Sequence, residues 1–212
     1  MDFQDFLEYV PKLLEVNLPA KDAHFKMIPM ERKESFENLN FDSLNPKTAA
    51  VMMLFYPKEG ITHLVLIVRN SYDGVHSAQI AFPGGKYEED DENYENTALR
   101  ETQEEIGIHQ SKIKVIRAFS KLYIQPSNFM VYPFLGICNE EIVFVPDSNE
   151  VSHIIELSIT DFLNDNLVVT VNLSTSYAKN IEVPAFKIKH HIVWGATAMM
   201  MSELKEVLKK VL

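Results

Sequence analysis

The sequence contains a single cysteine, Cys138, among its 212 residues and therefore cannot form an internal disulfide bond. It has no run of about 18 apolar residues that could cross a membrane as a helix. Lysine and arginine nowhere form a cluster, and the formal net charge is -10, which disfavours a nucleic-acid-binding surface. The first ten residues carry acidic side chains where a signal peptide would be basic. We therefore expect a cytosolic protein with no membrane or nucleic-acid partner.

The composition supports a hydrophobic core, because 46% of the residues are apolar. The length fits one domain with extensions. Apolar residues recur at helical spacing in residues 2–16, which predicts an amphipathic helix with Pro11 as an imperfection. Residues 21–46 are polar and irregular, so we expect an extended arm or loop there. We accordingly divide the chain into an N-terminal helix and arm at residues 1–46, packed on a domain at residues 47–212.

The order of the expected elements indicates the fold class. They are strands at 49–56 and 63–69 joined by a turn, a loop at 70–80, a helix from about residue 92, strands at 112–123, 130–138 and 142–145, a short helix at 157–163, strands at 167–171 and 183–188, and a closing helix at 197–212. Ser158 is a candidate N-cap of the short helix. Strands come first, with helices mid-chain and at the end, which predicts an α/β fold with a mixed sheet between helices.

The rest of the chain is organised around a turn and helix at residues 82–108. Gly84 and Gly85 in the turn permit a close approach of the backbone to a ligand. Gly107 lies where the helix needs a C-terminal cap. Helical spacing places Leu99, Gln103 and Ile106 on one face of this helix. The opposite face carries three glutamates within about 100° of one another.

These glutamates, Glu101, Glu104 and Glu105, are candidate metal ligands. Three close carboxylates repel one another unless a cation lies among them. Hard oxygen ligands on a rigid element suit Mg²⁺ or Mn²⁺. The ordinary alternative is a solvated helix face, which is what such a charge run usually forms.

The context of the glutamates resembles the Nudix box, a Gly and a Glu followed by REUxEExGU, in which U is apolar. The matching residues are Arg100, Glu101, Glu104, Glu105, Gly107 and Ile108. Thr102 departs from the pattern by replacing the usual apolar residue. The spacing in the first half of the motif also differs by one residue. Counting back from Arg100 puts the box Glu at Glu92, whereas counting forward from Gly85 reaches Asp91. One extra residue in this loop is similar to the coenzyme A pyrophosphatase branch of the family.

Two further segments resemble that branch. In residues 64–85, the matching residues are Arg69, His76, Gln79, Ala81 and the FPGG sequence at 82–85, whereas Ile67, Asn70, Gly74 and Ala78 depart from the motif. Residues 192–198 resemble its IWGxTA segment, for which we expect a structural role, with Trp194 packing, Gly195 turning and Thr197 starting the last helix.

The resemblance implies a Nudix-type α/β/α sandwich and hydrolysis of a nucleoside diphosphate linked to another group. For coenzyme A or an acyl derivative, the products implied are 3′,5′-ADP and 4′-phosphopantetheine. Mg²⁺ or Mn²⁺ would bind the three glutamates, and Arg100 would orient Glu104. Arg69 would contact a phosphate and Lys86 would do so more weakly, while the amides of Gly84 and Gly85 would approach the phosphate or aim the helix.

Several alternatives remain open. The substrate could be ADP-ribose or a modified nucleoside triphosphate, or the chain could be a non-catalytic nucleotide-binding regulator, against which the intact glutamates argue. Glu150 is a candidate base or further ligand. Candidates to line the site are Tyr123, Gln125, Ser127 and Asn128. We interpret His190 and His191 as a turn rather than a metal pair and Met199–Met201 as helix core. The N-terminal helix and arm are candidates for a homodimer contact.

Overall fold

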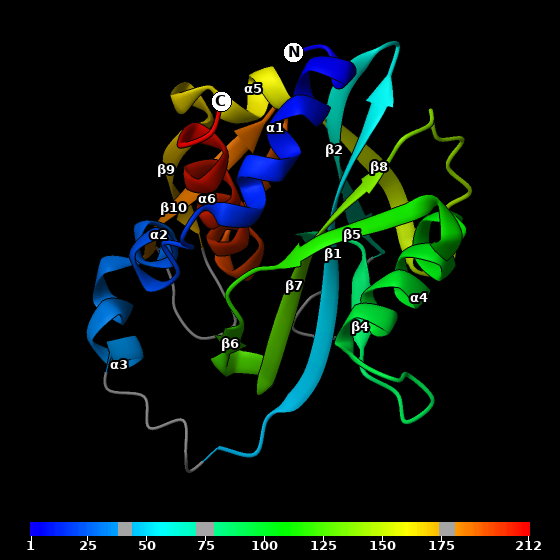
Figure 1. The fold of residues 1–212 in the computed structure, drawn as a ribbon. Helices are drawn as coiled ribbons and strands as arrows, with labels where there is room; N and C mark the ends of the chain where they lie inside the picture. The colour runs from blue at the N-terminus through cyan, green and yellow to red at the C-terminus, as the bar shows by residue number, and fades with distance from the viewer. Residues whose placement is uncertain (38–43, 71–78, 174–180) are drawn as a thin grey trace.

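The computed structural model describes residues 1–37, 44–70, 79–173 and 181–212. In these residues a mixed sheet lies between helices (Figure 1). Helix α4 (Tyr94–Ile106) covers one face of the sheet, and α1 (Phe3–Glu15) and α6 (Gly195–Lys209) cover the other (Figure 1). This arrangement confirms the predicted α/β/α sandwich with an N-terminal helix.

The main sheet contains one parallel pair within an otherwise antiparallel set. Its described strands are β1 (Lys47–Lys58), β2 (Ile61–Arg69), β3 (Ile80–Ala81), β4 (Gly84–Lys86), β5 (Ile113–Ala118), β6 (Leu122–Ile124), β7 (Phe129–Cys138) and β8 (Val151–Ser158). The order is β3-β2-β1-β7-β5, with β4 on β1, β6 on β7 and β8 on β2. Strands β1 and β2 form the predicted antiparallel hairpin, and β1 pairs with β7 in parallel.

A smaller sheet and several short helices complete the described fold. The smaller sheet is antiparallel and holds β9 (Val168–Leu173), β10 (Ile181–Ile188) and β11 (His191–Val193). The short helices are α2 (Lys21–His24), α3 (Lys33–Glu37) and α5 (Ile159–Leu163), with 3-10 turns at Phe25–Met27, Met30–Arg32, Gln110–Lys112, Gln125–Ser127 and Asp165–Leu167. The predicted hairpin at 167–171 and 183–188 is confirmed. So is Ser158 as N-cap of α5, since its side chain accepts from the Asp161 amide.

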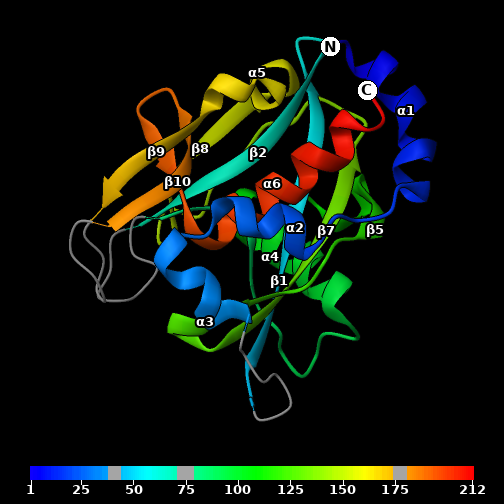
Figure 2. The same cartoon turned by 90° about the vertical axis from the view of Figure 1, so that its left-hand side faces the viewer.

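The prediction of an irregular arm over residues 21–46 is wrong for its first part. Helix α2 lies beside α6 (Figure 2), and Ala23 and His24 are buried. The Ser202 Oγ donates to the Ala23 carbonyl over 2.8 Å, and the His24 Nε2 lies 3.2 Å from the Glu203 carboxylate. These partners lie about 180 residues away in the chain, so local sequence could not indicate the helical turns.

Two strand predictions differ from the structure. Residues 142–145 form no strand, because their segment instead satisfies the end of α4. The Val145 amide donates to the Ile106 carbonyl and the Asp147 amide donates to the Glu105 carbonyl, both over 3.1 Å. Conversely, β8 was not predicted and pairs with β2 along most of its length.

The buried residues of α4 do not coincide with the face that carries Leu99, Gln103 and Ile106. Ala98, Thr102 and Glu105 are buried, whereas Leu99 and Gln103 are half-buried. The Thr102 hydroxyl donates to the Ala98 carbonyl over 2.6 Å, which satisfies its polar atom within the helix. Threonine therefore fits at this position although the motif favours an apolar residue. No described helix is long and apolar enough to cross a membrane.

Candidate active site

Local signals position α4 at the edge of the candidate site. The Asn93 side chain accepts from the Asn96 amide and caps the start of the helix. Gly107 ends it in the left-handed region, with φ of 77°, and its amide donates to the Gln103 carbonyl. A Cβ atom at Gly107 would lie 2.7 Å from the Cβ of Val145. Glycine is therefore required here by both conformation and space.

The two glycines of β4 bring its backbone against α4. Gly84 and Gly85 pair with Val51 and Ala50 of β1. A side chain at Gly84 would overlap the β1 backbone, with its Cβ 2.6 Å from the Val51 Cα, whereas one at Gly85 would overlap the Glu101 carboxylate. The Gly84 amide donates to the Glu105 Oε2 over 2.8 Å. The turn thus aims the helix carboxylates, which is one of the two roles that the sequence suggested.

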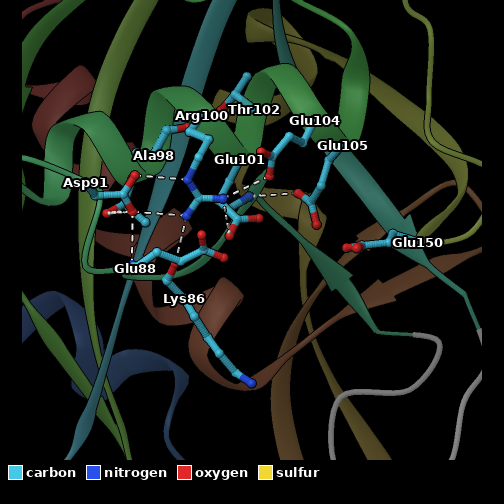
Figure 3. Close-up of polar contacts among 12 residues, drawn as sticks. Lys86, Glu88, Asp91, Ala98, Arg100, Glu101, Thr102, Glu104, Glu105 and Glu150 are labelled. Carbon is cyan, nitrogen blue, oxygen red and sulfur yellow. Dashed lines mark hydrogen bonds and ion pairs between the residues drawn. The ribbon is translucent and has the colours of Figure 1, made fainter.

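Arg100 is held by Asp91 in a two-point ion pair (Figure 3). The Arg100 Nε lies 2.9 Å from Asp91 Oδ1, and its Nη2 lies 3.0 Å from Oδ2. Asp91 is only 7% exposed and also accepts from the Thr97 hydroxyl. The hydrogen bonds from Arg100 lower the pKa of Asp91 to about 2. Glu92 is exposed, so the forward count from Gly85 finds the residue that holds Arg100.

The other nitrogen atoms of Arg100 bind the helix and the turn (Figure 3). Its Nη1 donates to the Glu104 Oε2 over 2.9 Å and to the Glu101 Oε1 over 3.2 Å. Its Nη2 also donates to the Lys86 carbonyl over 3.0 Å. The contact between Arg100 and Glu104 is the one that their spacing predicts. Arg100 therefore links two of the candidate ligands to β4.

Glu105 is the most enclosed carboxylate of the site, at 1% exposure. Its Oε1 accepts from the Arg69 Nη1 over 2.8 Å, and Arg69 Nη2 lies 3.7 Å from the exposed Glu150 carboxylate. Burial raises the pKa of Glu105 to about 7, although Arg69 and the Gly84 amide act in the opposite direction. Burial also raises the pKa of Glu101. The sequence predicted Arg69 as a phosphate contact and did not indicate its ion pair with Glu105.

The carboxylates are chemically suited to a divalent cation, but their side chains do not gather around one point in this structure. In the described part of the chain, no three His, Cys, Asp or Glu side chains come close enough together to hold a metal ion. Glu104 is directed toward Arg100, and Glu105 toward Arg69. Burial nevertheless disfavours the ionised forms of Glu101 and Glu105, and a bound cation would offset that cost. Hard carboxylate oxygens are the ligands that Mg²⁺ and Mn²⁺ prefer.

A cavity of about 520 Å³ opens beside these residues. Arg69, Gly84, Gly85 and Lys86 line it, so it is continuous with the candidate site. Three of the four predicted lining residues of the polar segment, Tyr123, Gln125 and Ser127, also line it, and Asn128 does not. Nothing in the sequence indicated the part of its wall formed by residues 27–36 and by the start of α6.

The remaining candidates have mixed outcomes. Met199–Met201 are buried in α6, as predicted, although Met199 and Met200 also line the cavity. Trp194 is half-buried and lines the cavity, and Gly195 begins α6 with φ of 64°. His191 begins β11 and faces His153, with their two Nε2 atoms 3.3 Å apart. The His190–His191 segment is therefore more than the turn that the sequence predicted. His76, Gly74 and Ala78 lie outside the described residues.

Comparison with known families assigns this chain to a family. The model of the NUDIX domain matches residues 46–171. The chain therefore belongs to the Nudix family. Nudix hydrolases as a class act on phosphoric anhydrides of small nucleotide derivatives and generally use divalent cations.

Three curated relatives illustrate the similarity. Nudix hydrolase 15, mitochondrial, of Arabidopsis thaliana is 34% identical over 127 residues, covering 58% of this chain and 44% of the relative. Nudix hydrolase 22, chloroplastic, of the same plant is 32% identical over 163 residues, covering 74% and 53%. This chain thus spans about half the length of these two. The mitochondrial coenzyme A diphosphatase NUDT8 of Mus musculus is 29% identical over 157 residues, covering 73% and 75%.

A solved structure supports the fold. The Nudix hydrolase RenU from M. smegmatis superposes with a TM-score of 0.53 at 15% identity. The match covers 79% of this chain and 88% of RenU. The similarity therefore extends beyond residues 46–171 in the fold, although at this identity it carries no information about substrate.

Proposed function

We propose that this chain hydrolyses the diphosphate bond of coenzyme A or its derivatives and releases 3′,5′-ADP and 4′-phosphopantetheine. The observation that supports this most is the position of Arg69. It ends the strand of the segment that resembles the coenzyme A pyrophosphatase motif, and it contacts Glu105 of the Nudix helix over 2.8 Å. The similarity to a protein named a coenzyme A diphosphatase adds support.

The reaction replaces a phosphorus–oxygen bond of the diphosphate by a bond to water oxygen, and negative charge accumulates on the phosphoryl oxygens. Glu101, Glu104 and Glu105 would hold Mg²⁺ or Mn²⁺, which supplies charge neutralisation and water activation when bound. Arg100, fixed by Asp91, keeps two of these carboxylates in place. Arg69 and Lys86 line the cavity and supply positive charge for an anionic substrate.

Glu150 is our candidate for the base that accepts a proton from the attacking water. Its side chain is 52% exposed and lies 3.7 Å from Arg69, beside the Glu105 carboxylate. A carboxylate in this place can reach water and is held near the site by Arg69. In Figure 3, Glu150 lies on the same side of α4 as Glu105.

The test is turnover on a substrate panel with product analysis. Purified protein with Mg²⁺ or Mn²⁺ would be given coenzyme A, ADP-ribose and modified nucleoside triphosphates, with Glu101→Gln as the control for a contaminating activity. We expect 3′,5′-ADP from coenzyme A in the wild type alone. Cleavage of only the other substrates would overturn the substrate assignment and leave the class of enzyme standing. Absence of turnover on all of them would favour a non-catalytic regulator.

A further inference from the structure

The cavity beside the diphosphate site is lined by two chemically different kinds of side chain. Arg69 and Lys86 line it beside the Nudix helix, and Arg32 of the arm also lines it. Elsewhere its wall includes buried apolar side chains, each no more than 5% exposed, of Met27, Ile28, Phe82, Leu122, Met199 and Met200. Its volume of about 520 Å³ lies in the range of pockets that enclose a drug-sized ligand. A long ligand with its anionic group beside Arg69 and Lys86 would therefore meet apolar wall with the rest of its length.

Much of the apolar wall lies outside the residues that define the family. Met27 and Ile28 belong to the N-terminal arm, and Met199 and Met200 belong to α6, whereas the family model matches residues 46–171. The flanking segments therefore supply four of these six apolar side chains, whereas Phe82 and Leu122 lie within the matched domain.

Hydrogen bonds on both sides of Met27 and Ile28 hold the arm in place as a wall. Ser202 donates to the Ala23 carbonyl over 2.8 Å, and the Glu203 carboxylate accepts from the Ala20 amide over 2.9 Å. The Glu203 carboxylate also lies 3.2 Å from His24 Nε2. Farther along, Arg32 donates to the Gln125 side chain over 2.8 Å and joins the arm to the segment between β6 and β7. The arm is attached on both sides of Met27 and Ile28, so these two side chains can limit the size of a ligand.

We infer that this cavity is a specificity pocket for an acyl chain carried by the substrate, and that Ile28 of the arm limits the length of chain that fits. The inference rests on the proposed function, because an acyl thioester of coenzyme A carries the diphosphate, the pantetheine arm and the apolar chain in one molecule, and the arm would lie between the diphosphate and the chain. Burying one methylene group in such a pocket strengthens binding about fourfold. Affinity should therefore rise with chain length until the cavity is full.

Binding can be measured without catalysis, because Trp194 is the only tryptophan of the chain and lines the cavity. Wild-type protein in chelator would be titrated with coenzyme A and its acetyl, hexanoyl and decanoyl thioesters while Trp194 fluorescence is recorded. We expect Kd to fall by about fourfold per methylene over part of this series. The KM for hydrolysis with Mg²⁺ should follow the same order.

Variants of Ile28 test the role of the arm. Ile28→Phe should weaken decanoyl-coenzyme A binding at least about tenfold and change coenzyme A binding less than about twofold. Ile28→Ala enlarges the pocket without overpacking and should shift the preference to longer chains. Met30→Phe is the matched control, since Met30 is 82% exposed on the same arm and does not line the cavity.

The results of these experiments test the proposed pocket and the proposed reaction separately. Equal affinity for all chain lengths, or equal behaviour of Ile28→Phe and Met30→Phe, overturns the inference even if coenzyme A is hydrolysed. Binding that depends on chain length without release of 3′,5′-ADP supports the pocket and overturns the proposed reaction. Failure to bind any of the four ligands in chelator overturns the pocket, and the substrate panel with Mg²⁺ or Mn²⁺ then tests the reaction by itself.

Discussion

Asp91 and Arg100 form the ion pair that fixes the start of the Nudix helix to its ligand-bearing middle. Both oxygens of Asp91 accept from the guanidinium, over 2.9 and 3.0 Å. Asp91→Asn should lower the free energy of unfolding at pH 7 by about 1–3 kcal/mol, because a buried charge-assisted pair is lost. It should also lower kcat/KM, because Arg100 then holds Glu101 and Glu104 less firmly. Urea denaturation and steady-state kinetics measure the two effects, with Asp90→Asn at an exposed neighbour as control.

The same pair predicts a pH dependence. The pKa of Asp91 is about 2 in the folded protein against 3.8 for an ordinary aspartate. The ionised carboxylate therefore stabilises the fold above about pH 4, and this contribution is lost as the pH falls toward 2. The difference in unfolding free energy between wild type and Asp91→Asn should shrink over that interval. A constant difference from pH 7 to pH 2 would show that the pair adds no pH-dependent stability.

We expect one added methyl group to lower the stability of the protein at Gly84 and its activity at Gly85. In Gly84→Ala the new Cβ meets the β1 backbone at Val51, so the variant should unfold at a clearly lower temperature. In Gly85→Ala the three atoms nearest to the new Cβ all belong to the Glu101 carboxylate, which can turn away. This variant should keep its melting temperature within a few degrees and lose activity by about 10-fold or more. Thermal melts and kcat/KM together check this, and equal loss of stability in both variants would contradict it.

Arg69→Ala should reduce kcat/KM by roughly 10- to 100-fold, the scale of a lost charge-assisted contact. The kinetic constants also separate its two possible contacts. A phosphate contact predicts a higher KM, whereas the observed ion pair with Glu105 predicts a lower kcat with little change in KM. Lys86→Ala, at an exposed cavity residue, should have a smaller effect. An unchanged kcat/KM in Arg69→Ala would remove Arg69 from the site.

Glu105→Gln should separate metal binding from stability. Activity should fall by orders of magnitude, while the metal-free protein melts at the same or a higher temperature, because the variant removes a buried charge that burial penalises. Metal that binds only the folded state stabilises it by about 2.7 kcal/mol at a hundredfold excess over Kd. The rise in melting temperature on adding Mg²⁺ or Mn²⁺ should therefore shrink in the variant. Glu95→Gln, on an exposed position of the same helix, is the control. If the metal-induced rise is unchanged in Glu105→Gln, this carboxylate is not a ligand.

Features that depend on local spacing could be predicted from the sequence. Helical periodicity and Gly107 defined α4, and the i,i+4 spacing of Arg100 and Glu104 predicted their contact. The hairpin of β1 and β2 followed from two apolar runs around a turn. Such features can be read from the sequence because the interacting residues lie within a few positions of one another.

Features formed by residues that are distant in the chain could be seen only in the folded structure. Because the loop has one extra residue, the sequence allowed either Asp91 or Glu92 as the acid of the Nudix box. In the structure, Asp91 is the residue buried against Arg100. The arm acquired helical turns through α6, and residues 142–145 capped α4 instead of forming a strand. The ion pair of Arg69 with Glu105 spans 36 positions. In each case a buried polar group had to find its partner, and that partner is set by packing rather than by neighbouring sequence.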